Sequence, residues 1–166
     1  MITAQRKALA LEKMSGDSRI WIYQASRLLT HEEIEGVSDE ITDFLLGWQA
    51  HGSDLMAGSE VFNGLFLVIA LDESFSAASG CSIDSCVRKI QEIGLRYNVD
   101  FMDRMKVAFQ NGNMTDLIPV KDLSASIESG LITGKALVFD NSIQTLSQLD
   151  QWLKPAEETW LKRYFK

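Results

Sequence analysis

RIWIYQA (residues 19–25), followed directly by SRLLTHEEIEGVSDEITDFLLGW (residues 26–48), is the stretch that decides the fold. The first segment is apolar on both alternating faces, a pattern typical of a strand that is buried on both sides. We therefore expect this strand to be central in its sheet. The second segment has the period of a helix, so the domain opens with a strand and a helix.

The helix predicted after Thr30 has a clear start signal. Thr30 and Glu33 have the spacing of a capping box, and Leu29 and Ile34 have that of a hydrophobic staple. Its apolar stripe consists of Ile34, Val37, Ile41, Phe44, Leu45 and Trp48. Five acidic residues lie largely on the other side: Glu32, Glu35, Asp39, Glu40 and Asp43. This acidic face is typical of a solvated helix surface.

Two Asn-Gly pairs predict β-hairpins. Asn63-Gly64 separates SEVF from LFLVIAL, and Asn111-Gly112 separates two further apolar segments. Pro119 indicates that the last of these strands ends there or runs along an edge. Between the hairpins we expect a helix over residues 82–97, in which Gly94 allows another backbone to pack closely.

The order strand, helix, strand, strand, helix, strand predicts an α+β fold with a ferredoxin-like (split βαβ) core and an antiparallel or mixed sheet. Both helices should cover one face of that sheet. A short helix (122–129), an extra strand (136–139), a helix from Thr145 and a docked apolar C-terminus are expected to follow. Residues 1–17 are predicted to be a disordered extension, with Met14 as an alternative start, and residues 18–166 a single domain.

Composition excludes several classes of protein. The chain has 166 residues and a formal net charge of −7, and this acidic balance argues against nucleic-acid binding. The longest apolar run, residues 65–71, is far shorter than the roughly 20 residues of a membrane helix, so we expect no membrane insertion. The charged N-terminus does not have the pattern of a signal peptide.

The two cysteines predict a reducing location. Cys81 and Cys86 lie five positions apart, and if both sit on one helix their Cα atoms are too far apart for a disulfide between them. Cys86 falls on the apolar stripe of that helix and is expected to be a core residue. Reduced thiols are typical of the cytoplasm.

The segment DESFSAASGCSID (residues 72–84) is the candidate binding site. It leaves an apolar strand and enters a helix, where the backbone N–H groups of Gly80, Cys81, Ser82 and Ile83 would attract a small anion. Ser79 and Ser82 would add hydroxyl groups. The simpler interpretation is that one of these serines caps the helix.

Two catalytic alternatives involve the same segment. Cys81 at a helix start could act as a nucleophile with His51 as its base, although the sequence names no third residue to orient them. Asp72 and Glu73 end an apolar strand as the acidic residues of a magnesium-dependent nucleotide hydrolase do. The chain has no G-x-x-x-x-G-K-[ST] phosphate loop. No cofactor and no metal site are predicted.

Five segments carry a resemblance to a known family: RIWIYQASRLLTHEE (19–33), WQAHG (48–52), DES (72–74), SGCSID (79–84) and the closing WLKRYF (160–165). They resemble a family of small uncharacterised bacterial proteins commonly carried under the label ABC transporter ATPase. The resemblance covers residues 19–165, and SGCSID is its most specific stretch. It marks the same loop as the residue patterns, and its label implies a role in nucleotide binding associated with a transporter.

Our first hypothesis is a non-enzymatic protein that binds a small anionic ligand or a protein partner near Ser79–Ser82. The alternatives are a small enzyme that uses Cys81 with His51, and an accessory or vestigial nucleotide-binding protein that uses Asp72 and Glu73. The hairpins leave edge strands, which would also allow homodimerisation.

Overall fold

The computed structural model describes residues 9–165. The predicted extension over residues 1–17 therefore lies partly outside the described residues. Its described part contains a 3-10 turn, Leu11–Lys13, in which Leu11 is buried. Leu9 forms a parallel bridge with Gly58 in strand β4 (Ala57–Phe62). Residues 9–13 thus pack against a strand.

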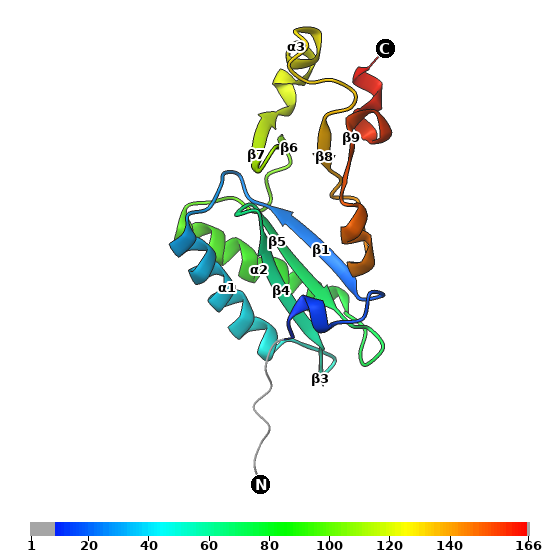
Figure 1. Cartoon of the computed structure of the whole chain (residues 1–166). Coiled ribbons are helices and arrows are strands. Elements are labelled where there is room, and N and C mark those ends of the chain that lie inside the picture. The colour runs from blue at the N-terminus through cyan, green and yellow to red at the C-terminus, as the bar shows by residue number, and fades with distance from the viewer. Residues whose placement is uncertain (1–8, 166) are drawn as a thin grey trace. The chain divides into compact units, whose positions relative to one another are not determined.

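The protein is an α+β protein with antiparallel sheets, and its chain divides into two compact units (Figure 1). Unit 1 comprises the residues up to Met102 together with Gln144–Ser147. Unit 2 comprises Asp103–Ile143 and the residues from Gln148 onward. A single domain over residues 18–166 stays a prediction.

The sheet of unit 1 has the order β1-β5-β4, with β1 at Arg19–Gln24 and β5 at Phe66–Leu71. The prediction that residues 19–25 form the central strand is wrong, because β5 lies between the other two. All six residues of β5 are apolar and fully buried, which suits a strand that has neighbours on both edges.

The outer edge of β1 is met by a short segment, Gln144–Ser147. The Ile20 N–H donates to the Gln144 carbonyl at 3.0 Å, and the Leu146 N–H donates to the Ser18 carbonyl at 2.9 Å. Arg19 and Thr145 form an isolated antiparallel bridge. These contacts belong to unit 1, although residues 143 and 148 on either side belong to unit 2.

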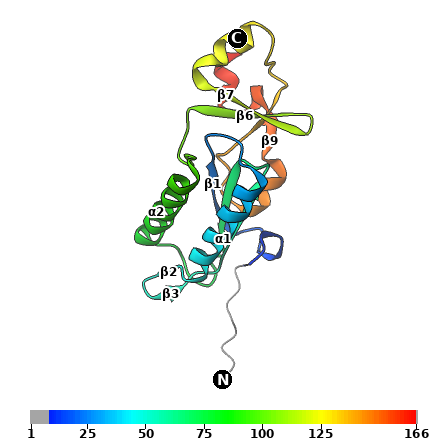
Figure 2. The same ribbon diagram turned by 90° about the vertical axis from the view of Figure 1, so that its left-hand side faces the viewer.

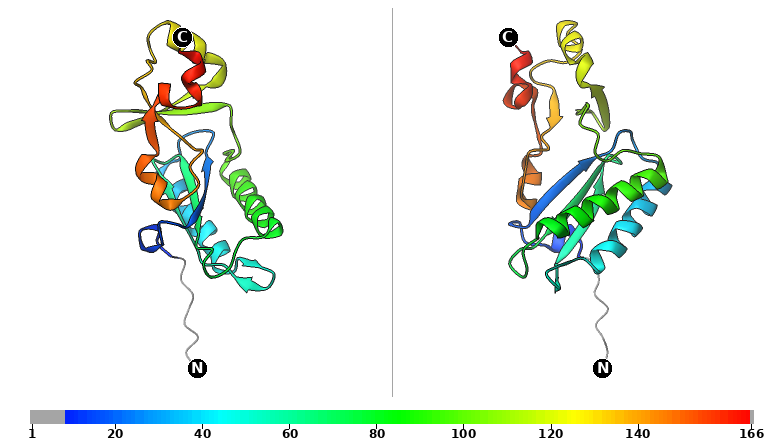
Figure 3. Two further views of the ribbon diagram at one scale, coloured as in Figure 1. Left: turned by 90° about the vertical axis from the view of Figure 1, so that its right-hand side faces the viewer. Right: turned by 180° about the vertical axis from the view of Figure 1, so that it is seen from behind.

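Two helices, α1 (His31–Leu46) and α2 (Gly80–Tyr97), lie side by side on one face of this sheet, as Figure 3 shows in its right-hand view. The predicted capping box of Thr30 and Glu33 is confirmed. Gly94 is needed where expected, since a Cβ there would lie 2.5 Å from the Val99 carbonyl oxygen.

Arg27 ties the two helices together. Its guanidinium donates to both Glu33 carboxylate oxygens, at 2.8 and 2.9 Å, and to the Tyr97 carbonyl at 2.8 Å. Glu33 also accepts the Thr30 N–H. The Arg27 bonds and this backbone bond hold the pKa of Glu33 well below its usual range, at about 2.

Both predicted hairpins are confirmed, but the second belongs to a different sheet. Asn63 and Gly64 turn the chain between β4 and β5 with positive φ angles of 54° and 61°. The second hairpin joins β6 (Lys106–Asn111) to β7 (Met114–Pro119), and Pro119 does end an edge strand.

The sheet of unit 2 has the order β7-β6-β8-β9, with β8 at Leu137–Phe139 and β9 at Leu153–Pro155. β6 was the expected fourth strand of a ferredoxin-like core, but it pairs with β7 and β8. A complete split βαβ sheet is therefore not confirmed. The tight turn after β6 pairs it with β7 on one edge, and β8 pairs with the other edge of β6, so neither edge is left for the sheet of unit 1.

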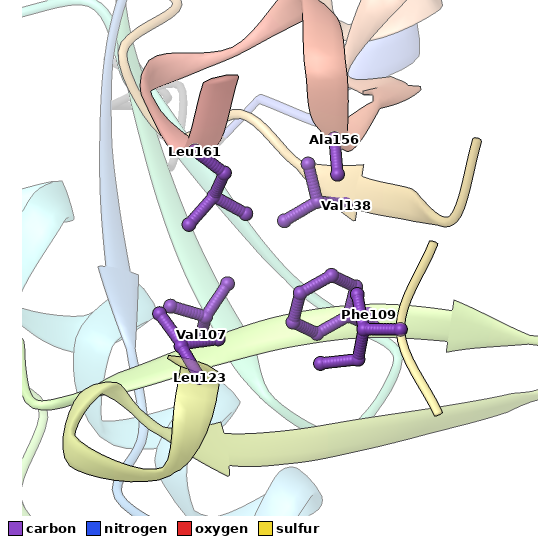
Figure 4. Close-up of a cluster of buried hydrophobic side chains, with 7 residues drawn as sticks. Val107, Phe109, Leu123, Val138, Ala156 and Leu161 are labelled. Atoms are coloured by element: carbon purple, nitrogen blue, oxygen red, sulfur yellow. The ribbon is translucent and has the colours of Figure 1, made fainter. Parts of the chain in front are cut away.

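A separate apolar core holds unit 2 together (Figure 4). It contains Val107, Phe109, Leu123, Ile132, Val138, Ala156 and Leu161. Leu123 begins helix α3 (Leu123–Glu128), the short helix that was predicted. The helix expected from Thr145 is a 3-10 helix, Leu146–Gln151. Two more 3-10 helices, Ala156–Glu158 and Trp160–Tyr164, close the chain.

Candidate functional site

The candidate segment forms the loop between β5 and α2, which we call the α2 loop (residues 72–82). Asp72 begins it and uses one carboxylate oxygen to accept the Ser74 N–H at 3.0 Å and the Ser74 hydroxyl at 2.6 Å. These bonds lower the pKa of Asp72. The Asp72 N–H donates to the Met56 carbonyl. Asp72 therefore shapes the first turn of the loop.

Glu73 contacts both the backbone of the loop and a residue of β1. One of its carboxylate oxygens accepts the Ala78 N–H at 3.1 Å, and the other lies 3.6 Å from an Arg19 guanidinium nitrogen. Arg19 itself stacks over the Trp21 ring, 4.6 Å from its centroid. Both acidic residues of the nucleotide-binding alternative thus already bond to the chain's own groups.

Ser79 and Ser82 form a reciprocal cap at the start of α2. The Ser82 N–H donates to the Ser79 hydroxyl at 3.1 Å, and the Ser79 N–H donates to the Ser82 hydroxyl at 2.8 Å. The Ser82 hydroxyl also donates to the Ser79 carbonyl. Ser82 is buried, so its hydroxyl serves the helix cap.

Trp48 anchors this first turn to the end of α1. Its indole N–H donates to the Ser82 carbonyl at 2.8 Å, in a buried position. The sequence placed Trp48 on an apolar stripe, and its burial confirms that position. The polar role of Trp48 was missed, because the bond joins residues that are 34 positions apart.

Of the four predicted amide donors, those of Ser82 and Ile83 are already bonded to the Ser79 hydroxyl and carbonyl, which corrects that part of the prediction. Gly80 and Cys81 are exposed, and their backbone N–H groups donate no hydrogen bond among the described residues. Phe75, near the middle of the loop, has 68% of its surface exposed. Sequence reasoning also missed Phe75, which was quoted within the polar segment but given no role.

His51 and Cys81 are not joined. His51 occupies the exposed turn between β2 (Gln49–Ala50) and β3 (Ser53–Asp54), with a φ of 50°. This hairpin lies beside α2, which Figure 2 shows, and β2 contacts the helix. No hydrogen bond links His51 to Cys81 within the described part of the chain.

Both cysteines are free thiols, which confirms that they do not bridge each other. Cys81 is exposed on the first turn of α2. Cys86 is buried on the side of α2 that packs into unit 1, and burial raises its pKa to about 12. The two thiols therefore differ in access, and Cys81 is the one that a solute can reach.

Comparison of the chain with protein-family models, curated proteins and solved structures found no match. Between residues 9 and 165, no helix is both long and apolar enough to cross a membrane. The same residues contain no group of three or more His, Cys, Asp or Glu side chains arranged to hold a metal ion.

Proposed function

We propose that the protein is a non-enzymatic binding protein that recognises a small anion or a protein partner at the α2 loop. The observation that carries this proposal is that Gly80 and Cys81 are exposed and that their backbone N–H groups donate no hydrogen bond among the described residues. They stand at the positive end of an 18-residue helix, where an anion is favoured.

The bonds within the loop support this proposal. The Asp72, Glu73 and Ser79 side chains all bond to nearby backbone groups, so the loop keeps its shape without a ligand. A partner that binds to a preformed loop loses less conformational entropy than one that must order it. Binding would therefore use the N–H groups that the loop leaves unbonded.

Gly80 offers a sharp test, because it is the first residue of α2. Proline is well tolerated at this position and removes the N–H, and the extended backbone of Ser79 suits a residue before proline. A Cβ at Gly80 would meet nothing within 4 Å. Gly80→Pro thus deletes one anion donor, and Gly80→Ala is the matched control that keeps it.

The measurement is the rise in melting temperature with inorganic phosphate or acetate, at ionic strength balanced with sodium chloride. Wild type and Gly80→Ala should gain the same saturable stabilisation, and Gly80→Pro should lose most of it. An equal rise in all three proteins would assign the effect to the general action of the salt on stability and would refute the anion site.

Phe75 favours a protein as the larger ligand, because a mostly exposed aromatic ring on a rigid loop is typical of a binding surface. A photoreactive phenylalanine analogue at position 75 should form a discrete adduct in cells. The adduct should persist with Gly80→Ala and decline with Gly80→Pro. An adduct whose yield is unchanged in Gly80→Pro would show that the partner at Phe75 does not bind through the proposed anion site.

A cysteine-dependent enzyme is the second candidate, favoured by the contact between β2 and α2 that brings the His51 hairpin to the Cys81 helix. It requires Cys81 to react with iodoacetamide faster than an ordinary exposed thiol at neutral pH, and His51→Ala to remove the difference. Cys86→Ala leaves Cys81 as the only thiol for this measurement. An ordinary rate would eliminate the enzyme.

Nucleotide binding is the function that the resemblance to proteins labelled ABC transporter ATPase implies. We propose that the chain belongs to that family because of the five segments quoted above. The part of this proposal with the least support is nucleotide binding by Asp72 and Glu73. Their carboxylates already accept bonds from Ser74 and Ala78. Millimolar MgATP should leave the melting temperature unchanged, and a saturable rise would favour the nucleotide hypothesis instead.

We further propose that unit 1 is a ferredoxin-like core in which Gln144–Ser147 takes the place of the fourth strand. The order β1-β5-β4, with both helices on one face, is the order of the first three strands of that fold. The Gln144 and Leu146 bonds lie on the free edge of β1, where the fourth strand would pair. Two free thiols support a cytoplasmic location.

A further inference from the structure

We propose that Trp160, Arg163 and Tyr164 form a docking surface for a carboxylate-bearing segment of a partner protein. We call these three residues the Trp160 surface. It lies in unit 2, on the last 3-10 helix, and is separate in the chain from the α2 loop. Its partner chemistry follows from one cation, two aromatic rings and the charge around them.

Arg163 is held in place by the rings. Its guanidinium carbon lies 5.2 Å from the Trp160 ring centroid and 5.3 Å from that of Tyr164. The two rings meet edge to face, with centroids 6.2 Å apart. A stacked guanidinium keeps its N–H donors in the plane of the group, where they can pair with both oxygens of a carboxylate.

The Trp160 surface is exposed, and the residue next to Trp160 is anchored in the core of unit 2. Trp160 has 49% of its surface exposed, whereas Leu161, the next residue, is 1% exposed and belongs to the core of unit 2. The Leu161 side chain points into that core in Figure 4. Thr159 caps the helix by accepting the Leu161 N–H. A partner would therefore meet side chains that are already ordered.

The charges favour an acidic partner. Among the described residues no carboxylate pairs with Arg163, and Lys162 beside it is also basic and exposed. The Glu157 side chain lies against Gly134, and among the described residues it forms no ion pair with Arg163. Glu157 and Glu158 are the nearby exposed acids in sequence, and both should compete weakly with an incoming carboxylate. Trp, Tyr and Arg are also the residue types that dominate binding energy at protein interfaces.

The test is an NMR titration that follows the Trp160 indole N–H and the Arg163 side-chain N–H. The probe is a short peptide that alternates glutamate with leucine. A peptide with glutamine in place of glutamate is its uncharged control. We expect a saturable shift with the glutamate peptide, about tenfold weaker affinity in Arg163→Gln, and little change in Lys162→Gln. Glu158→Gln should strengthen binding.

Arg163→Lys separates charge from stacking, because lysine keeps the charge but lacks the planar fork, and it should bind nearly as weakly as Arg163→Gln. Unchanged signals from the unit 2 core would show that each variant is folded. The proposal is overturned by equal shifts with the glutamine peptide, by an unaltered affinity in Arg163→Gln, or by no saturable shift at all. Inorganic phosphate or a single-stranded oligonucleotide acting as strongly as the peptide would also overturn it.

Discussion

The two units differ in how they use charge and apolar surface. Unit 1 contains 15 acidic and 8 basic residues, whereas unit 2 contains 8 of each, so the whole net charge of −7 belongs to unit 1. Of nine large hydrophobic side chains exposed among the described residues, six belong to unit 2. They are Met105, Met114, Leu131, Leu137, Leu153 and Trp160.

This difference follows from the elements that each unit contains. Unit 1 packs two helices of 16 and 18 residues on a fully buried strand and exposes an acidic helix face. Unit 2 has an α-helix of only six residues and a small core, so it covers less of its apolar surface. Single exposed apolar residues are ordinary on a protein surface, and only a contiguous patch of them is typical of an interaction surface.

The largest expected effects test whether each core supports its own unit. Phe66→Ala in β5 should lower the free energy of unfolding by about 3–5 kcal/mol, and Leu161→Ala in unit 2 by about 2–5 kcal/mol. Hydrogen exchange should show each loss mainly in its own unit. Equal loss of protection throughout the chain in both variants would show one cooperative domain.

A smaller loss is expected from Gly94→Ala, although alanine favours helices. The new Cβ would lie 2.5 Å from the Val99 carbonyl oxygen, so the turn after α2 must shift at a cost of about 1–3 kcal/mol. Chemical denaturation measures this change. Gly80→Ala, whose Cβ meets open space, should be nearly neutral; a comparable loss there would mean that the close contact is not the cause.

Trp48→Phe should destabilise unit 1 by about 1–2 kcal/mol, because it removes the buried bond to the Ser82 carbonyl but keeps an aromatic ring. Faster hydrogen exchange in the first turn of α2 should accompany the loss. Trp160→Phe, at an exposed position in unit 2, is the control and should change stability by less than about 0.5 kcal/mol. Equal effects at both positions would contradict the anchoring role of Trp48.

The pH dependence of stability should reveal the Arg27–Glu33 pair. The pKa of Glu33 is lowered to about 2 in the folded protein, below its value near 4.5 when unfolded. Its contribution is therefore complete above about pH 4.5 and is lost as the pH falls toward 2. Denaturation curves of Glu33→Gln should show a shallower decline over this range. Parallel profiles for the two proteins would mean that Glu33 is not responsible.

Local signals in the sequence predicted local structure well. Thr30 with Glu33 fixed the start of α1, and Asn63-Gly64 fixed the first hairpin, because each signal acts within a few residues. The strand positions that depend on distant pairing were not predictable in this way. The 19–25 strand looked central because both its faces are apolar, yet among residues 9–165 its outer edge pairs with just a short segment, Gln144–Ser147.

The sequence indicated where the candidate loop lies in the chain, but it did not predict which residues the loop contacts. SGCSID identified the start of α2, and the serine cap followed from residue type and spacing. The Trp48 bond and the Arg19–Glu73 pair join residues far apart in sequence, so no local pattern could indicate them. Burial of Ser82 and exposure of Phe75 likewise depend on the whole packed unit.

The most direct test of the proposed function is a residue-by-residue NMR map of backbone amides during titration with inorganic phosphate. The account predicts saturable shifts at Gly80 and Cys81, retained at Cys81 in Gly80→Ala and lost there in Gly80→Pro. Shifts that leave Gly80 and Cys81 unmoved, or a Cys81 response that survives Gly80→Pro unchanged, would contradict an anion site at the start of α2.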